Sequence, residues 1–204
     1  MDIAFAADKG GVGKTTLAYH VATRLRQVGA DICLIDLDGR SASTAWVGET
    51  GYVPAYTYEV LSSGLPDHAV RVWDTPAHPG PEMRRTLAEL VDIIVVVAQP
   101  DRESQRAAID LYAHLTPINP LVRVLLNAFP PTSREGQVSA QALTEAGIAC
   151  LRTTVRAYRC YQRAQWDERA VCDYPYPSAD NAWSDVCALT DEILETLNGR
   201  QVNA

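Results

Sequence analysis

Two patterns of apolar residues alternate along the chain. Short unbroken apolar runs are typical of strands that are covered on both faces of a parallel sheet. Apolar residues dominate 3–7, 32–35, 70–73, 93–97, 121–126 and 148–155, and the runs are unbroken in 3–7, 32–35 and 93–97. Between most of them, apolar residues recur at the spacing of a helix. The alternation predicts an α/β fold with a mostly parallel, twisted sheet and helices on both faces, formed by a single domain over residues 1–204.

The helical pattern is regular in most of the connecting segments. Helices are expected over residues 16–28, 83–90, 109–115, 138–145 and 179–197. The last of them is expected to have Ser178 as its cap and to stop at Gly199. Residues 39–69 differ because glycines and prolines interrupt them, so we expect loops there, with one short helix near residues 58–61.

Residues 9–16 read Lys-Gly-Gly-Val-Gly-Lys-Thr-Thr and lie between the first strand and the first helix. A glycine-rich turn in this position directs backbone N–H groups and the positive end of the helix dipole at an anion. We therefore expect a phosphate-binding loop, with Lys14 on the outer phosphates and the Thr15 hydroxyl on Mg²⁺. The expected nucleotide contacts come from Gly10, Gly11, Val12, Gly13, Lys14, Thr15 and Thr16. The strict spacing of such loops would place another glycine at position 8, where this chain has Asp8.

Polar residues stand at the ends of the predicted strands. Asp36 and Asp38 follow the second apolar run, and Asp74, Gln99 and Asn127 follow the next three. Ligands of parallel sheets bind at the carboxyl ends of the strands, so these side chains are expected to converge with the glycine-rich loop on one edge. On an extended backbone Asp36 and Asp38 would also point the same way, because they are two residues apart.

Composition excludes several classes of protein. The chain of 204 residues has a formal charge of −7 at pH 7 and is 47% hydrophobic, which is ordinary for a globular domain. Its five cysteines form no C-x-x-C pair, and their odd number argues against a disulfide framework. No apolar run approaches the length of a membrane span, and we expect a cytoplasmic protein. Lys9 and Lys14 are the only lysines among 18 Lys and Arg residues, and a compact ammonium group suits a crowded phosphate site.

The loop, with its extra lysine, resembles that of the ParA/MinD branch of P-loop ATPases, whose signature lysine would be Lys9. The D-L-D of residues 36–38 is similar to the second acidic motif of that family, and the V-W-D-T-P of residues 72–76 to its Walker B motif. The stretch 153–177, with Tyr174 and Pro175, resembles the part of the family near the adenine, and Asn127 resembles the residue that reads the adenine edge. After the acidic motif the family usually has Pro-Gln, where this chain has Gly39-Arg40.

The resemblance is greatest to small ParA-like plasmid partition ATPases and implies hydrolysis of ATP to ADP and phosphate with Mg²⁺. Lys9, Lys14 and Asp38 are the expected catalytic residues, with Lys9 reaching across a dimer to the partner's nucleotide and Asp38 orienting the attacking water. Mg²⁺ is expected near three residues, Thr15, Asp36 and Asp74. The implied partners are a second copy of the chain, non-specific DNA, and a centromere-binding or adaptor protein that stimulates hydrolysis. No membrane is implied, and the expected location is the nucleoid.

Residues 150–170 are locally basic although the chain is acidic. The window holds five arginines against Asp167 and Glu168, a net charge of +3 that leaves −10 for the rest of the chain. If this window is helical, Arg156, Arg159 and Arg163 share one face, and we predict that they contact DNA phosphates without reading bases. The alternative is a helix face that simply faces solvent.

Three other functions are considered for a loop of this kind. A metal-cluster carrier would need paired cysteines that face each other across a dimer. A MinD-like membrane switch would need a C-terminal amphipathic helix, for which residues 200–204 are too short. A small-molecule ligase of the dethiobiotin synthetase type would act without DNA or a protein partner. Measuring ATP hydrolysis with and without DNA therefore distinguishes such a ligase from a partition ATPase.

Overall fold

The computed structural model describes residues 1–38, 46, 52–132 and 134–201. Within these residues the strands form one parallel sheet in the order β3-β2-β4-β1-β5-β6-β7. Their bounds are β1 Asp2–Ala7, β2 Ile32–Asp36, β3 Ala55–Thr57, β4 Val70–Ala77, β5 Ile93–Ala98, β6 Val122–Phe129 and β7 Cys150–Arg156. The central strand is β1, with β2, β3 and β4 on one side of it and β5, β6 and β7 on the other. The predicted α/β fold is confirmed.

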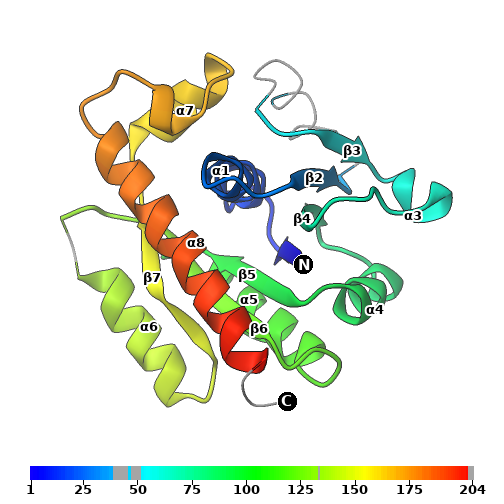
Figure 1. Ribbon diagram of the computed structural model, residues 1–204. Helices are drawn as coiled ribbons and strands as arrows, with labels where there is room; N and C mark the ends of the chain where they lie inside the picture. The colour runs from blue at the N-terminus through cyan, green and yellow to red at the C-terminus, as the bar shows by residue number, and fades with distance from the viewer. Residues whose placement is uncertain (39–45, 47–51, 133, 202–204) are drawn as a thin grey trace.

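Helices cover both faces of this sheet (Figure 1). One face carries α1 Lys14–Gln27 and α8 Ala179–Gln201, and the other carries α4 Pro81–Leu90, α5 Arg102–Leu115 and α6 Glu135–Glu145. The remaining described helices are short, namely α3 Val60–Ser63, α7 Arg159–Trp166 and the 3₁₀ helix η1 Val171–Asp173. Successive residues of β1 alternate between the two cores, as the two-residue period of a strand requires.

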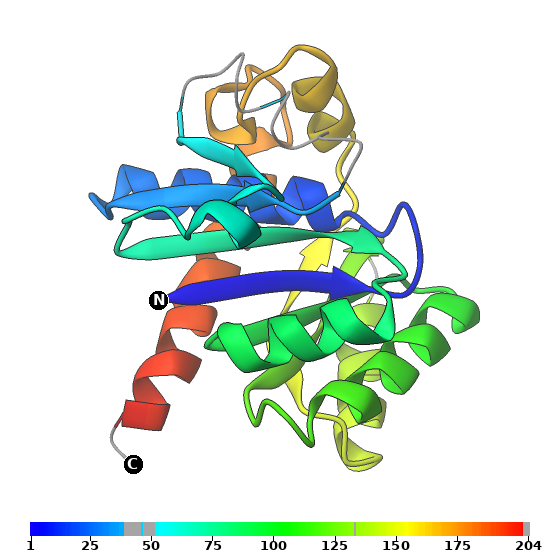
Figure 2. The same cartoon turned by 90° about the vertical axis from the view of Figure 1, so that its right-hand side faces the viewer.

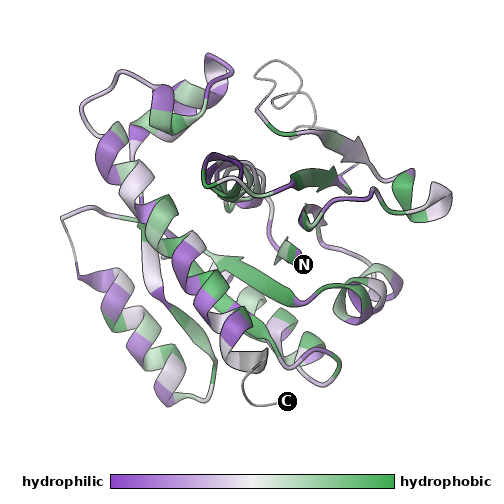
Figure 3. Cartoon of the chain, viewed as in Figure 1, coloured by the Kyte–Doolittle hydropathy of each residue, from purple (hydrophilic) through white to green (hydrophobic). Residues whose placement is uncertain are grey.

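The inner strands are mostly apolar because both faces of the sheet are covered. Figure 3 shows β2 and β5 as strongly apolar ribbons, and every residue of β5 is buried. Continuous burial of this kind explains why unbroken apolar runs predict these strands correctly.

Three details differ from the sequence prediction. The short helix expected near residues 58–61 is α3, and a strand that the apolar pattern does not predict, β3, precedes it at the sheet edge, where it pairs with β2. Gly199 does not end the last helix, since α8 continues to Gln201. Packing of its long face on the sheet outweighs the roughly 1 kcal/mol cost of a glycine inside a helix. The Gly39-Arg40 departure lies outside the described residues.

The glycine-rich loop lies at the carboxyl edge of the sheet. Figure 2 shows β1 and β4 pointing toward the same side of the molecule, where the loop leads from β1 into α1. Open parallel sheets bind their ligands outside this edge, near the point where the strand order reverses. None of the helices in the described part of the chain combines the length and apolar composition needed to traverse a bilayer.

Candidate functional site

The loop between β1 and α1 has the backbone conformation of an anion-binding turn. Gly11 and Gly13 have φ angles of 73° and 96°, a region that glycine enters without the steric cost borne by other residues. Gly13 is the residue before α1, and the first turn of this helix contains no acidic residue. The positive end of the helix dipole therefore faces the loop without a competing carboxylate on its own first turn.

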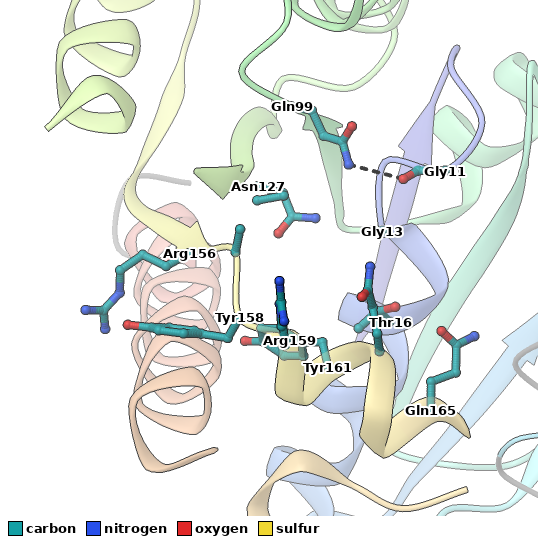
Figure 4. A pocket seen from close by; sticks show the side chains of 13 residues that line it. Gly11, Gly13, Thr16, Gln99, Asn127, Arg156, Tyr158, Arg159, Tyr161 and Gln165 are labelled. Carbon is teal, nitrogen blue, oxygen red and sulfur yellow. Dashed lines mark hydrogen bonds between the residues drawn. The ribbon is translucent and has the colours of Figure 1, made fainter. Parts of the chain in front are cut away.

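Two cavities adjoin this loop. The first, here called the loop cavity, has a volume of about 280 Å³ and is lined by Gly10, Gly11, Gly13, Lys14, Thr15, Thr16, Asp38, Ala77 and Gln165. The second, here called the α7 cavity, has a volume of about 350 Å³ (Figure 4) and is lined on its far side by residues 156–159, 161, 162 and 165. Both cavities share Gly11, Gly13, Thr16 and Gln165. Their combined size is in the range of small-molecule and cofactor sites.

Lys14 is buried in the loop cavity, with 7% of its surface exposed. Burial lowers the pKa of its ammonium group below the ordinary value, and the negative charges of Asp74 and Asp38 oppose that shift. A buried cation of this kind is stabilised further when an anion enters the cavity. The environment therefore fits the predicted contact between Lys14 and nucleotide phosphates.

Asp36 and Asp74 lie side by side on adjacent strands, Asp36 at the end of β2 and Asp74 within β4, which continues past the predicted end of this strand to Ala77. They are partners in the register of β2 and β4, and each is 1% exposed. The described residues contain no group of three or more His, Cys, Asp or Glu that could hold a metal ion. Mg²⁺ is commonly held by one or two carboxylates together with substrate phosphates, so this pair fits a site that ATP itself completes.

Asp38 lies beyond the end of β2. The strand ends at Asp36, and the backbone N–H of Asp38 donates to Asp36 Oδ1 at 2.9 Å. The expected extended backbone through both residues is therefore wrong, because this side-chain-to-backbone bond turns the chain after the strand. As a result Asp38 lines the loop cavity together with Lys14, whereas Asp36 is not among the described residues that line it.

Lys9 lies outside the loop cavity. Its ammonium group contacts Asp101 Oδ1 at 2.7 Å and Glu103 Oε2 at 3.3 Å, at the start of α5. The hydrogen bond with Asp101 raises the pKa of Lys9 and lowers that of Asp101. These side chains are accessible to solvent, so the ion pairs add little stability and can give way to another anion.

Two amide side chains from the ends of β5 and β6 contact the loop. Gln99 Nε2 donates to the carbonyl oxygen of Gly11 at 3.1 Å (Figure 4), and Asn127 Nδ2 donates to that of Val12 at 2.6 Å. A Cβ atom at Gly13 would lie 2.4 Å from Asn127 Nδ2, so no larger residue fits there without displacing that amide. The contact of Asn127 with adenine stays a prediction, which its position in the α7 cavity allows.

The wall of the α7 cavity comes from residues 156–165, within the stretch 153–177 that the resemblance places near the adenine, although the side chains named there as adenine contacts were Tyr174 and Pro175. Four of its side chains recur at helical spacing, Tyr158, Tyr161, Gln162 and Gln165. That spacing is the signal in the sequence that could have found them. Tyr174 and Pro175, which were predicted near the adenine, are not among the described residues that line either cavity. The Tyr174 hydroxyl instead donates to Asp167 at 2.7 Å.

The arginines predicted to share one helix face lie on two different elements. Arg152 and Arg156 belong to β7, and Arg159 and Arg163 belong to α7. The strand continues through Arg156 because this residue pairs with Phe129 of β6. The prediction of a single helical face is therefore wrong for Arg156.

Arg156 is also engaged in an ion pair. Its guanidinium group contacts Asp185 of α8 at 2.6 Å, and the same carboxylate accepts from the Arg156 backbone N–H at 3.0 Å. Arg159 and Arg163 are exposed on α7, with the Arg163 guanidinium 5.2 Å from the centroid of the Tyr176 ring. The charge of Arg163 thus faces solvent and that of Arg159 borders the α7 cavity, whereas that of Arg156 is compensated.

The fold and the loop together define a P-loop nucleotide-binding protein. Residues 3–165 match the family described as CbiA, the CobQ/CobB/MinD/ParA nucleotide binding domain, and the chain belongs to this family. Within it the chain is an ATPase of the ParA type.

Two relatives and one solved structure illustrate the similarity. The chain is 26% identical over 203 residues to "Maintenance of carboxysome distribution protein A" of Gloeobacter kilaueensis, covering 94% of this chain and 93% of that protein. It is 31% identical over 148 residues to "Chromosome partitioning protein ParA" of Caulobacter vibrioides, covering 71% of this chain and 53% of that protein. The septum site-determining protein MinD of Pyrococcus horikoshii, complexed with Mg-ADP, has the same fold, with a TM-score of 0.72 at 14% identity over 94% of this chain and 95% of that one.

Proposed function

We propose that this protein is an ATPase that dimerises with ATP, binds DNA without sequence preference and positions a plasmid, a chromosome or another cellular cargo. The observation that carries the proposal is the placement of the two loop lysines, with Lys14 buried in the loop cavity and Lys9 outside it. Relatives named for carboxysome distribution and chromosome partitioning support a positioning role. A centromere-binding or adaptor protein is the proposed partner that stimulates hydrolysis, and the nucleoid is the proposed location.

The loop cavity is the proposed site of the ATP phosphates. Lys14 and the N–H groups of the loop hold the phosphates, and the Thr15 hydroxyl together with Asp74 holds Mg²⁺, with Asp36 close by. The ion supplies neutralisation of the charge on the phosphates. Asp38 orients the attacking water, a role supported by its position in the same cavity as Lys14. The adenine then lies in the α7 cavity, where Asn127 reads its edge.

In this proposal Lys9 acts on the nucleotide of a second subunit. Its contacts with Asp101 and Glu103 are accessible to solvent, so a triphosphate, which carries more negative charge, competes for the same ammonium group. Lys9→Ala is therefore expected to keep ATP binding and to lose ATP-dependent dimerisation and most of the hydrolysis. Light scattering with a non-hydrolysable ATP analogue measures the dimer. Arg102→Ala, which removes an exposed cation beside Asp101, is the control, and a normal dimer with normal turnover in Lys9→Ala contradicts the role.

Arg159 and Arg163 are the better supported of the three arginines proposed to bind DNA. They are exposed and four residues apart on α7, so they lie on one face. Arg156 contributes less, because Asp185 compensates its charge. Replacing Arg159 and Arg163 by Ala is expected to weaken ATP-dependent binding equally on unrelated DNA sequences. Each lost phosphate contact lowers the slope of log affinity against log salt by roughly 0.9.

Two arginines of α5 provide a matched control for this experiment. Arg102 and Arg106 are also exposed and four residues apart on a helix. Their double replacement by Ala removes the same charge from another surface and is expected to keep the salt dependence of the parent protein. Equal effects of the two double variants would mean that DNA responds to the net charge of the protein and that α7 is not its binding surface.

The proposal as a whole is tested by the rate of ATP hydrolysis with and without DNA, together with the mass of the ATP-bound form. A rate that changes with DNA and a dimer that forms with the non-hydrolysable analogue are the expected results. Lys14→Ala is expected to abolish both responses, because it removes the buried cation of the loop cavity. Hydrolysis that ignores DNA in a protein that stays monomeric with ATP would overturn the proposal in favour of a small-molecule ligase.

A further inference from the structure

Two consecutive carbonyl groups of the loop accept hydrogen bonds from side chains that are distant in sequence. Gly11 accepts from Gln99, 88 positions away, and Val12 accepts from Asn127, 115 positions away. The donors stand just after β5 and near the end of β6, which are neighbours in the sheet. Asn127 is 8% exposed. The loop is therefore held by two amides that the sheet itself positions.

These two contacts determine where the next N–H groups point. The described part of the chain has no cis peptide bond, and in a trans peptide the C=O and the following N–H point in opposite directions. With the Gly11 and Val12 carbonyls turned toward Gln99 and Asn127, the N–H groups of Val12 and Gly13 point away from them. Lys14 lines the loop cavity, and neither amide is among the described residues that line it.

We propose that Gln99 and Asn127 form an amide clamp that orients the Gly11–Val12 and Val12–Gly13 peptides so that their N–H groups face the nucleotide phosphates. Both are positioning residues, because they act through the loop backbone. Neighbouring N–H dipoles that point the same way repel each other when no anion is bound. The hydrogen bonds from Gln99 and Asn127 to the loop carbonyls maintain this orientation before the phosphates bind. The inference rests on the proposed binding of phosphates by the loop.

The surroundings of Gly13 agree with the clamp. Its φ of 96° already excludes most side chains, but Gly29 and Gly64 have similar angles of 90° and 106° with nothing within 4 Å of a Cβ. At Gly13 the nearest atom is Asn127 Nδ2 at 2.4 Å. The space that a Cβ atom at Gly13 would occupy is therefore filled by the amide that donates to Val12, which places Asn127 directly against the loop.

The experiment separates phosphate binding from base binding. Gln99→Met keeps the length of the side chain and removes the donor at a position that is half-buried, and Asn127→Ala removes the second donor. Gln105→Met is the control, because Gln105 Nε2 makes a bond of equal length, 3.1 Å, to the carbonyl of Pro100, which is not a residue of the loop. Dissociation constants are measured by competition against a fluorescent ATP analogue, with tripolyphosphate and adenosine as separate probes. Unfolding in urea confirms that each variant is folded.

Each clamp variant is expected to weaken tripolyphosphate and ATP about fivefold, the value of a hydrogen bond worth about 1 kcal/mol, and to leave adenosine unchanged in Gln99→Met. The amide ¹H–¹⁵N resonances of Val12 and Gly13 are expected to shift in both clamp variants and to keep their parent positions in Gln105→Met. Unchanged tripolyphosphate binding in both variants would overturn the clamp, as would a loss confined to adenosine. A parent protein that binds neither tripolyphosphate nor ATP would instead overturn the proposed phosphate site and the clamp with it.

Discussion

His20 connects the helix of the phosphate loop to the segment that follows α7, and we predict that it makes the fold sensitive to acid. Its imidazole on α1 is fully buried, with 0% of the residue exposed. Nδ1 lies 2.7 Å from the carbonyl oxygen of Thr16, and Nε2 accepts the backbone N–H of Val171 at 3.0 Å. Since Nε2 is used as an acceptor, the neutral ring carries its proton on Nδ1 and donates it to Thr16. A second proton would have to replace the acceptor that Val171 needs.

The size of the effect follows from the pKa of this residue. Burial lowers the pKa of His20 from its ordinary value of 6.5 to about 4, and the hydrogen bond to Thr16 opposes the shift only in part. In the unfolded chain the residue binds a proton below pH 6.5, whereas in the folded protein it does so only near pH 4. The free energy of unfolding therefore falls as the pH decreases through this window, and above it His20 causes no change. At about 1.4 kcal/mol per pKa unit the full loss is roughly 3 kcal/mol.

Urea unfolding near neutral pH and near the lower end of that window tests the prediction. His20→Asn cannot titrate there, so it is expected to be less stable than the parent near neutral pH but to lose roughly 3 kcal/mol less on acidification. His114→Asn, which replaces an exposed histidine, is expected to keep the full acid response of the parent. Equal acid losses in the parent and His20→Asn would refute the reasoning, because the folded protein would then protonate His20 as readily as the unfolded chain does.

Three further substitutions test the site and its support. Asp38→Ala is expected to form the ATP-bound dimer and to slow single-turnover hydrolysis by about a hundredfold or more. A rate equal to that of the parent would mean that another residue orients the attacking water. Gly13→Ala is expected to lower the free energy of unfolding by at least about 2 kcal/mol and to abolish ATP binding in equilibrium titrations, because it combines a positive φ with a 2.4 Å contact. Gly29→Ala, with a positive φ but open surroundings, should lose about 1 kcal/mol and bind ATP normally. Arg156→Ala is expected to destabilise the fold by about 1–3 kcal/mol in urea, because it removes the ion-pair partner of Asp185, whose side chain on α8 is only 9% exposed. The control Arg159→Ala should stay within about 0.5 kcal/mol of the parent. Equal stability of the two variants would show that the ion pair contributes nothing.

The strands that the sequence predicts most directly are those whose burial is continuous, namely β1, β2 and β5. β5 is buried at every residue, and an unbroken apolar run is the direct consequence of helices on both faces. β3 escapes the pattern because it is three residues long and half-buried at the edge of the sheet. Its formation depends on pairing with β2, which is a contact between distant parts of the chain.

In the basic window of residues 150–170 the local pattern predicted the wrong backbone conformation. The spacing of Arg156, Arg159 and Arg163 is compatible with one helix, and nothing local contradicts it. The structure divides the arginines between β7 and α7 because Arg156 extends the strand opposite Phe129 and pairs with Asp185. Arginines at helical spacing share a face only if the backbone between them is helical. Here pairing with β6 keeps the backbone at Arg156 extended.

The sequence by itself determined the family, the glycine-rich loop and the strand–helix order, because each depends on residues that are adjacent or regularly spaced along the chain. Tertiary structure alone decided what holds the loop in place. Gln99, Asn127 and His20 each contact a partner 88 to 151 positions away, and no local pattern specifies such a partner. Packing of the sheet and its helices brings these polar groups together, and the need to satisfy buried hydrogen-bonding groups then selects their contacts.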